Sequence, residues 1–168
     1  MARHPRVPTA VGRDVAVVIG SFAVLGVLCG VLWWLVVTPA EFTKLRNGAT
    51  MSELELSKQF AADGYYVVIA AVVGVVAGVA LTWWRSRDAL LTSALLALGS
   101  VLAAALMAGT GHLLGPGPTS AALAAAKVGE KVPERLDVDT FVVYLAWPLA
   151  VLLGACVVLF GKTLEPDA

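Results

Sequence analysis

The stretch Ala89–Gly111, ALLTSALLALGSVLAAALMAGTG, contains no charged residue and is long enough for a helix to cross a bilayer. Three further runs have the same character, at Val15–Val37, Tyr65–Trp84 and Thr140–Phe160. Each is about 20 residues or longer, which suits a hydrocarbon core about 30 Å thick. We therefore predict an all-α membrane protein whose single domain, residues 15–160, is built on four transmembrane helices at these runs.

The composition agrees with a membrane protein. Hydrophobic residues make up 59% of the chain and charged residues 14%, against about 25% charged in typical soluble domains. Four spans within 168 residues leave no room for a separate soluble domain. The formal net charge is zero, so bulk electrostatics indicate no nucleic-acid partner, and the predicted surroundings are the lipid bilayer.

Positive charges are dense at one end of the predicted bundle, in the tails (residues 1–14 and 161–168) and in the link between the second and third runs. The residues concerned are Arg3, Arg6, Arg13, Arg85, Arg87 and Lys162. The two long connections, residues 38–64 and 112–139, have Lys and Arg residues that are more widely spaced and outnumbered by carboxylates. The positive-inside rule then predicts both termini in the cytoplasm and both long connections outside.

The first run has an alternative interpretation as a cleaved signal peptide, with Thr38-Pro39-Ala40 as a weak cleavage site. Signal-peptide apolar regions are about 7–15 residues long, which is shorter than this run. The run also ends in Trp33-Trp34, a pair typical of an interfacial anchor. These features favour an uncleaved helix.

The two halves of the chain have the same layout, and each consists of a span, a long connection and a second span. Asp63 precedes the aromatic start of one inward-running span, and Asp139 precedes the aromatic start of the other. A parallel internal duplication would explain this layout. A polar helix cap followed by interfacial aromatics, repeated independently, would explain it equally well.

We expect a short amphipathic helix in each long connection. In the first, Ser52 and Glu55 have capping-box spacing ahead of apolar residues that include Phe60. In the second, Thr119 or Ser120 would cap a helix over Ala121–Val128 that Gly129 ends. Neighbouring acids and bases in these segments fit either a solvated surface or a docking surface for a partner.

Small residues spaced by four lie on single helix faces of three spans and allow close helix packing. The positions are Gly26, Gly30, Ala70, Gly74, Gly78, Ala105 and Gly109. They fit packing within the bundle, and they also fit homodimerisation or contact with another membrane protein. Pro148 lies inside the fourth span and should kink it.

No carboxylate, Lys, Arg or His lies within the four spans, so the usual carrier groups of ion-coupled transport are missing. Cys29 and Cys156 would lie at different depths and cannot pair, and both are interpreted as small buried apolar residues. His112 is the one candidate for acid–base or metal chemistry, with Asp63 and Asp139 at a similar level. Helix capping explains the two aspartates more simply, so we expect no enzyme, metal or cofactor.

Three segments carry a resemblance to a known family: Thr43–Ala49 in the first connection, Trp83–Arg87 after the second span, and Gly111–Gly117 after the third. With these, the chain from about Val15 to Phe160 resembles a family of four-helix integral membrane proteins of unknown function from high-GC Gram-positive bacteria. The resemblance implies a bacterial plasma-membrane location and the same topology. It implies no activity.

The function expected from the sequence is non-catalytic. The chain would be an accessory protein that binds an envelope membrane-protein partner, or associates with copies of itself, through its outer connections and Gly-rich helix faces. The alternative is a subunit of a small oligomeric transporter or channel, in which hydroxyl side chains would line the path. Those side chains are Thr82, Thr92, Ser93, Ser100 and Thr110. The same hydroxyls can also bond to their own helix backbone.

Overall fold

The computed structural model describes residues 9–85 and 89–164, with side chains for residues 12–84 and 89–161. Four of its helices are long and apolar enough to cross a membrane, which confirms that the four predicted runs form long apolar helices. These are α1 (Thr9–Val36), α2 (Glu53–Arg85), α3 (Ala89–Leu114) and α6 (Ala146–Leu164). Arg3, Arg6 and Arg87, which contribute to the predicted orientation, lie outside the described residues.

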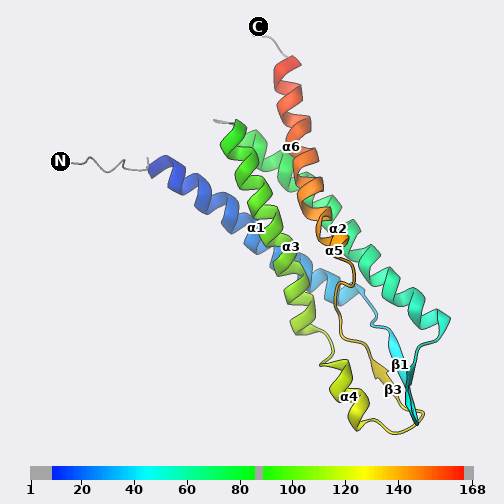
Figure 1. Cartoon of the computed structure of the whole chain (residues 1–168). Coiled ribbons are helices and arrows are strands. Elements are labelled where there is room, and N and C mark those ends of the chain that lie inside the picture. The colour runs from blue at the N-terminus through cyan, green and yellow to red at the C-terminus, as the bar shows by residue number, and fades with distance from the viewer. Residues whose placement is uncertain (1–8, 86–88, 165–168) are drawn as a thin grey trace.

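The four long helices pack mainly as two pairs, α1 with α3 and α2 with α6 (Figure 1). The contacts advance in the same direction along both members of a pair, so paired helices run parallel: Gly26 lies against Ala103, and Gly30 lies against Met107. A Cβ atom placed on Gly26 would lie 2.7 Å from the carbonyl oxygen of Ala103. Glycine therefore allows the two backbones to touch at this crossing.

A small antiparallel sheet lies beyond the end of the bundle where α1 finishes (Figure 1). Its strands are β1 (Glu41–Leu45), β2 (Gly48–Thr50) and β3 (Lys131–Pro133), in the order β2-β1-β3. Phe42 of β1 pairs with Val132 of β3, so the sheet joins the two long connections. We call residues 37–64 and 115–140 together the sheet end. The sheet was not predicted, because strands of three to five residues are too short to show an alternating pattern.

The expectation of a separate amphipathic helix in residues 38–64 was wrong. The predicted cap is present, since Ser52 Oγ accepts a hydrogen bond of 3.3 Å from the Glu55 amide. The helix that begins there, however, continues without a break as α2 to Arg85. Gly64 does not end it, because helical backbone geometry costs glycine only about 1 kcal/mol relative to alanine. Asp63 is therefore inside a helix and is not a cap.

The short helix expected in the second connection is present as α4 (Thr119–Ala125), but its predicted ends were wrong. Pro118 is the N-cap, with no side-chain capping bond. The Thr119 hydroxyl instead accepts a hydrogen bond of 2.9 Å from the Arg135 amide. The helix ends at Ala125, and Gly129, with φ +88°, forms the turn that leads to β3.

The fourth span is divided, and not only kinked, near Pro148. A four-residue helix, α5 (Phe141–Tyr144), precedes Leu145, and α6 begins at Ala146. Pro148 has no N–H to donate to the carbonyl of Tyr144, and its ring crowds that carbonyl, so one uniform helix cannot run through this point. Thr140 is the N-cap of α5, which excludes Asp139 from the predicted capping position.

Aromatic side chains fill the core where the bundle meets the sheet end. Trp33 is fully buried and donates a hydrogen bond of 2.8 Å to the carbonyl oxygen of Ala62, so it is not the interfacial anchor that the sequence suggested. Its ring meets Tyr66 edge to face with centroids 5.4 Å apart. The Tyr66 hydroxyl in turn donates a hydrogen bond of 2.8 Å to the carbonyl oxygen of Ala104, which ties α2 to α3.

Candidate functional site

The structure separates the three predicted site residues into two groups. Asp63 and Asp139 come together, since burial and then the charge of Asp139 raise the pKa of the Asp63 carboxyl. His112 pairs instead with Asp137, at 3.5 Å between Nδ1 and Oδ2. Sequence reasoning missed Asp137 because its approach to the end of α3 depends on the path of the chain between β3 and α5.

Asp139 lines an acidic cavity of about 230 Å³ between α2 and residues 134–139, and Asp137 lies on the same wall. Gln59 bridges its walls, donating 2.9 Å to Asp139 Oδ2 and 3.3 Å to Glu134 Oε1. Burial, together with the charge of Asp139, raises the pKa of the Glu134 carboxyl. Asp63 Oδ1 is buried and accepts no hydrogen bond from the described residues. Glu134, Asp137 and Asp139 thus place three carboxyl groups on the cavity wall, beside Arg135.

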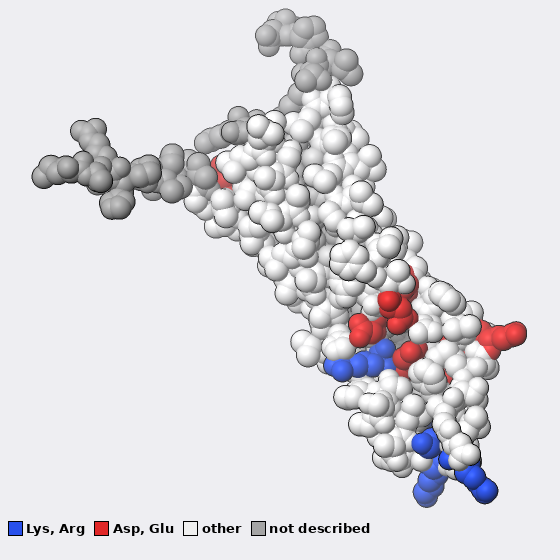
Figure 2. Space-filling view, in the orientation of Figure 1, with Lys and Arg blue, Asp and Glu red and all other residues white. Residues whose placement is uncertain are grey.

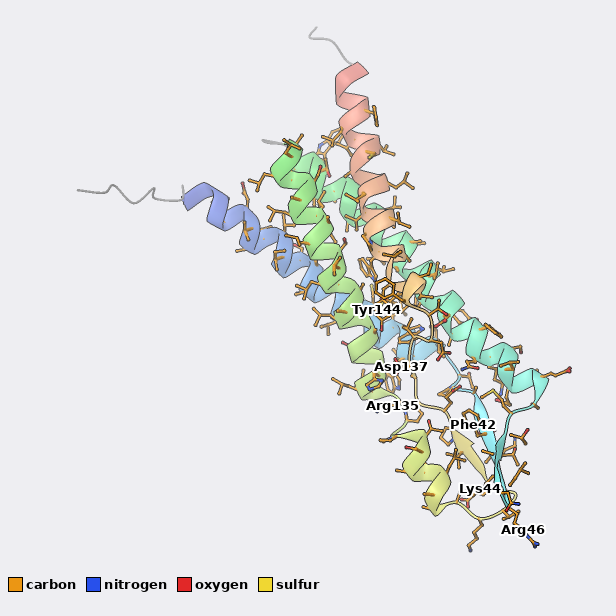
Figure 3. All side chains as sticks on the ribbon, viewed as in Figure 1. Phe42, Lys44, Arg46, Arg135, Asp137 and Tyr144 are labelled. Atoms are coloured by element: carbon orange, nitrogen blue, oxygen red, sulfur yellow. The ribbon has the colours of Figure 1, made fainter. Side chains whose placement is uncertain are left out.

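The second group lines a cleft of about 310 Å³ that we call the His112 cleft. Its polar wall is formed by His112, Asp137 and Tyr144, and its apolar wall by one face of α3. Figure 3 shows Asp137 and Tyr144 on the same side of the molecule, at the junction of the bundle with the sheet end. The residues of the apolar wall are Ala105, Ala108 and Gly109.

Acidic and basic side chains occupy different parts of the sheet end (Figure 2). Carboxylates gather next to the bundle, and the far tip is basic, with Lys44 and Arg46 at the β1–β2 hairpin (Figures 2 and 3). Of the neighbouring acid–base pairs expected from sequence, Glu55 and Lys58 pair at 2.8 Å. Glu41 pairs with Lys131 at 3.0 Å, across the β1–β3 junction, and not with a base close to it in sequence.

Among the described residues, no group of three His, Cys, Asp or Glu side chains is arranged to hold a metal ion. The two thiols do not pair: Cys29 is buried, whereas Cys156 is exposed and not the buried residue expected from sequence.

The predicted small-residue faces divide into two kinds. Most lie inside the bundle: Gly26, Gly30, Gly74 and Gly78 each meet a partner helix, and Ala70 is fully buried. Ala105 and Gly109 lie on the His112 cleft, where a Cβ on Gly109 would have no neighbour within 4 Å.

The hydroxyls considered for a transport path are mostly enclosed. Thr82, Thr92 and Ser100 are buried, and Ser100 donates a hydrogen bond of 2.8 Å to the Ala97 carbonyl of its own helix. An opening of about 850 Å³ between α1 and α2 is lined almost entirely by apolar residues. It contains Ser21 and no other polar side chain.

Comparison with protein families, curated proteins and solved structures finds no match to this chain.

Proposed function

We propose that this chain is a non-catalytic membrane protein of the bacterial plasma membrane, and that its sheet end binds a partner protein in the envelope. Both termini would lie in the cytoplasm, as the dense positive charge of the tails and the link favours. The sheet end would then project outside. The resemblance to four-helix membrane proteins of high-GC Gram-positive bacteria supports the same location.

The observation that carries the proposal is the pairing of β1 with β3. It joins residues from both long connections into one sheet, which supports an ordered surface built from both connections. The Lys131–Glu41 ion pair and the Gln59 bridge hold the same two connections together. Loops of this length usually carry structure or function.

Exposed apolar side chains on the first turns of α2 support a binding role. Leu54 and Phe60 are 69% and 70% exposed, although both belong to the sheet end and not to the middle of a span. Leu56, one turn before Phe60, is also exposed. Apolar groups exposed on an ordered surface are typical of a contact site for another protein.

Photocrosslinking in native membranes tests this proposal. A photoreactive amino acid replaces Phe60 in one variant and Leu98 of α3 in a matched control, with an affinity tag after Ala168. Leu98 is 66% exposed and lies within a long apolar helix, so it serves as a control for lipid-facing positions. We expect one discrete adduct with a second protein at position 60 and none at position 98.

Intact-particle mass in mild detergent provides the independent readout. A stoichiometric second protein supports the proposal. A pure homo-oligomer without such a partner refutes it and favours the transporter-subunit alternative. A monomer with no adduct at position 60 also refutes it.

A further inference from the structure

We propose that the His112 cleft binds a phospholipid with a primary ammonium headgroup, with the ammonium at Asp137 and the upper acyl chain along Ala105 and Gly109. The proposal does not depend on an envelope partner.

The cleft has the size of a molecular site. Its volume of about 310 Å³ is at the lower end of the range for ligand pockets. It is equivalent to roughly ten water molecules, at about 30 Å³ each, and is therefore too large for a single ion or water.

Polarity changes along the cleft as it does along a lipid. His112, at one end, is in the last turn of α3, whereas Ala105 is two turns earlier, about 10 Å deeper along the helix axis at 1.5 Å per residue. Gly109 lies between them and leaves open space beside the helix. A headgroup at the polar end would thus place the start of its chain against the small residues of α3.

The charge around the polar end favours a cation. Asp137 has a half-exposed carboxylate at the cleft. Glu134 and Asp139 add negative charge in the adjoining acidic cavity, and Arg135 is the one cation among its lining residues. An anionic headgroup would meet net repulsion here.

A primary ammonium can donate hydrogen bonds to acceptor atoms on the wall of the cleft. The Asp137 carboxylate and the Tyr144 hydroxyl oxygen are both acceptors on its wall. Charge-assisted bonds of this type are roughly twice as strong as neutral ones. A quaternary choline headgroup has no such hydrogens, so the cleft should discriminate against it.

Native mass spectrometry of the full chain tests the proposal. The purified protein is equilibrated with an equimolar mixture of phosphatidylethanolamine, phosphatidylcholine and phosphatidylglycerol carrying the same acyl chains. We expect the ethanolamine lipid to be enriched about tenfold in the bound fraction, the ratio that corresponds to about 1.4 kcal/mol. Asp137→Asn should reduce this enrichment to about twofold or less, because it removes the charged acceptor.

Two leucine variants separate the cleft from general lipid contact. Gly109→Leu fills the chain slot and should abolish the enrichment, with Ala105→Leu as a second variant at the same wall. Gly20→Leu is the matched control, since its Cβ also has no neighbour within 4 Å but faces the α1/α2 groove. Equal binding of the three lipids, preference for phosphatidylglycerol, or enrichment that survives Gly109→Leu and Ala105→Leu would each overturn the proposal.

Discussion

Gly78 of α2 and Gly154 of α6 make reciprocal contacts on one another's helices: Gly78 lies against the Val151 carbonyl, and Gly154 lies against the Val75 carbonyl. The two glycines are 76 positions apart, and so are Val75 and Val151. In the other pair, Gly26 and Ala103 are 77 positions apart, as are Gly30 and Met107. The α2/α6 contacts are reciprocal, as at a two-fold interface, whereas the α1/α3 contacts advance in step along two parallel helices. Both helix pairs join the first half of the chain to the second.

Division of the chain between the halves tests whether these contacts alone hold the halves together. Residues 1–87 and 88–168, expressed as two chains, should reassemble, because the α1/α3 and α2/α6 contacts both lie between the halves. The measurement is recovery of the first half with a tag placed after Ala168. Failure to recover the first half from membranes that contain both halves would show that the α1/α3 and α2/α6 contacts do not hold the halves together.

Gly78→Ala should destabilise the protein, because the added Cβ would overlap the Val151 backbone. Overpacking of this kind costs typically 1–3 kcal/mol, that is, about that much of the free energy of unfolding. Gly64→Ala is the matched control on the same helix. Its Cβ meets nothing within 4 Å, so alanine should stabilise α2 by about 0.5–1 kcal/mol. Thermal unfolding in detergent, followed by tryptophan fluorescence, should move in opposite directions for the two variants.

Tyr66→Phe should reduce the free energy of unfolding by about 1 kcal/mol, since it removes the buried hydrogen bond to the Ala104 carbonyl. Tyr65→Phe removes the same hydroxyl one position earlier, where the side chain is half exposed. We expect that change to stay within about 0.5 kcal/mol. Equal losses in chemical denaturation of the two variants would show that the Tyr66 bond does not link α2 to α3.

Glu134→Gln should stabilise the protein at neutral pH. Burial, and then the charge of Asp139, raises the pKa of the Glu134 carboxyl in the folded state above its ordinary value. The folded state therefore binds this proton more tightly than the unfolded chain. Stability falls as the pH rises from the ordinary pKa through the raised pKa, and the penalty remains at higher pH. Glutamine removes the penalty and can still accept the hydrogen bond from Gln59.

The measurement is the difference in Tm between Glu134→Gln and the wild-type protein across the pH range. We expect a clear gain at about pH 8 and a smaller one at about pH 4, where much of the carboxyl is already protonated. A gain that does not change with pH would assign the effect to packing and not to the charge.

The candidate site was only partly predictable from the sequence. His112 and Asp139 could be singled out by their residue type and their place beside a span. That His112 meets Asp137, and that Gln59 bridges Glu134 and Asp139, could not be predicted, because these contacts join α2 and α3 to residues 134–139 of the sheet end. A local sequence pattern cannot predict contacts between residues so far apart in the chain.

Local pattern by itself determined the four long apolar helices. A bilayer interior requires every backbone group to be satisfied within its own helix, so long apolar runs such as Ala89–Gly111 have only one structure available. Tertiary structure decided how those helices pair, where β1 meets β3, and why α2 extends through Gly64 while the fourth span divides at Leu145. These outcomes depend on contacts between residues far apart in the chain, whose energies are set by shape and proximity and not by the composition of any one segment.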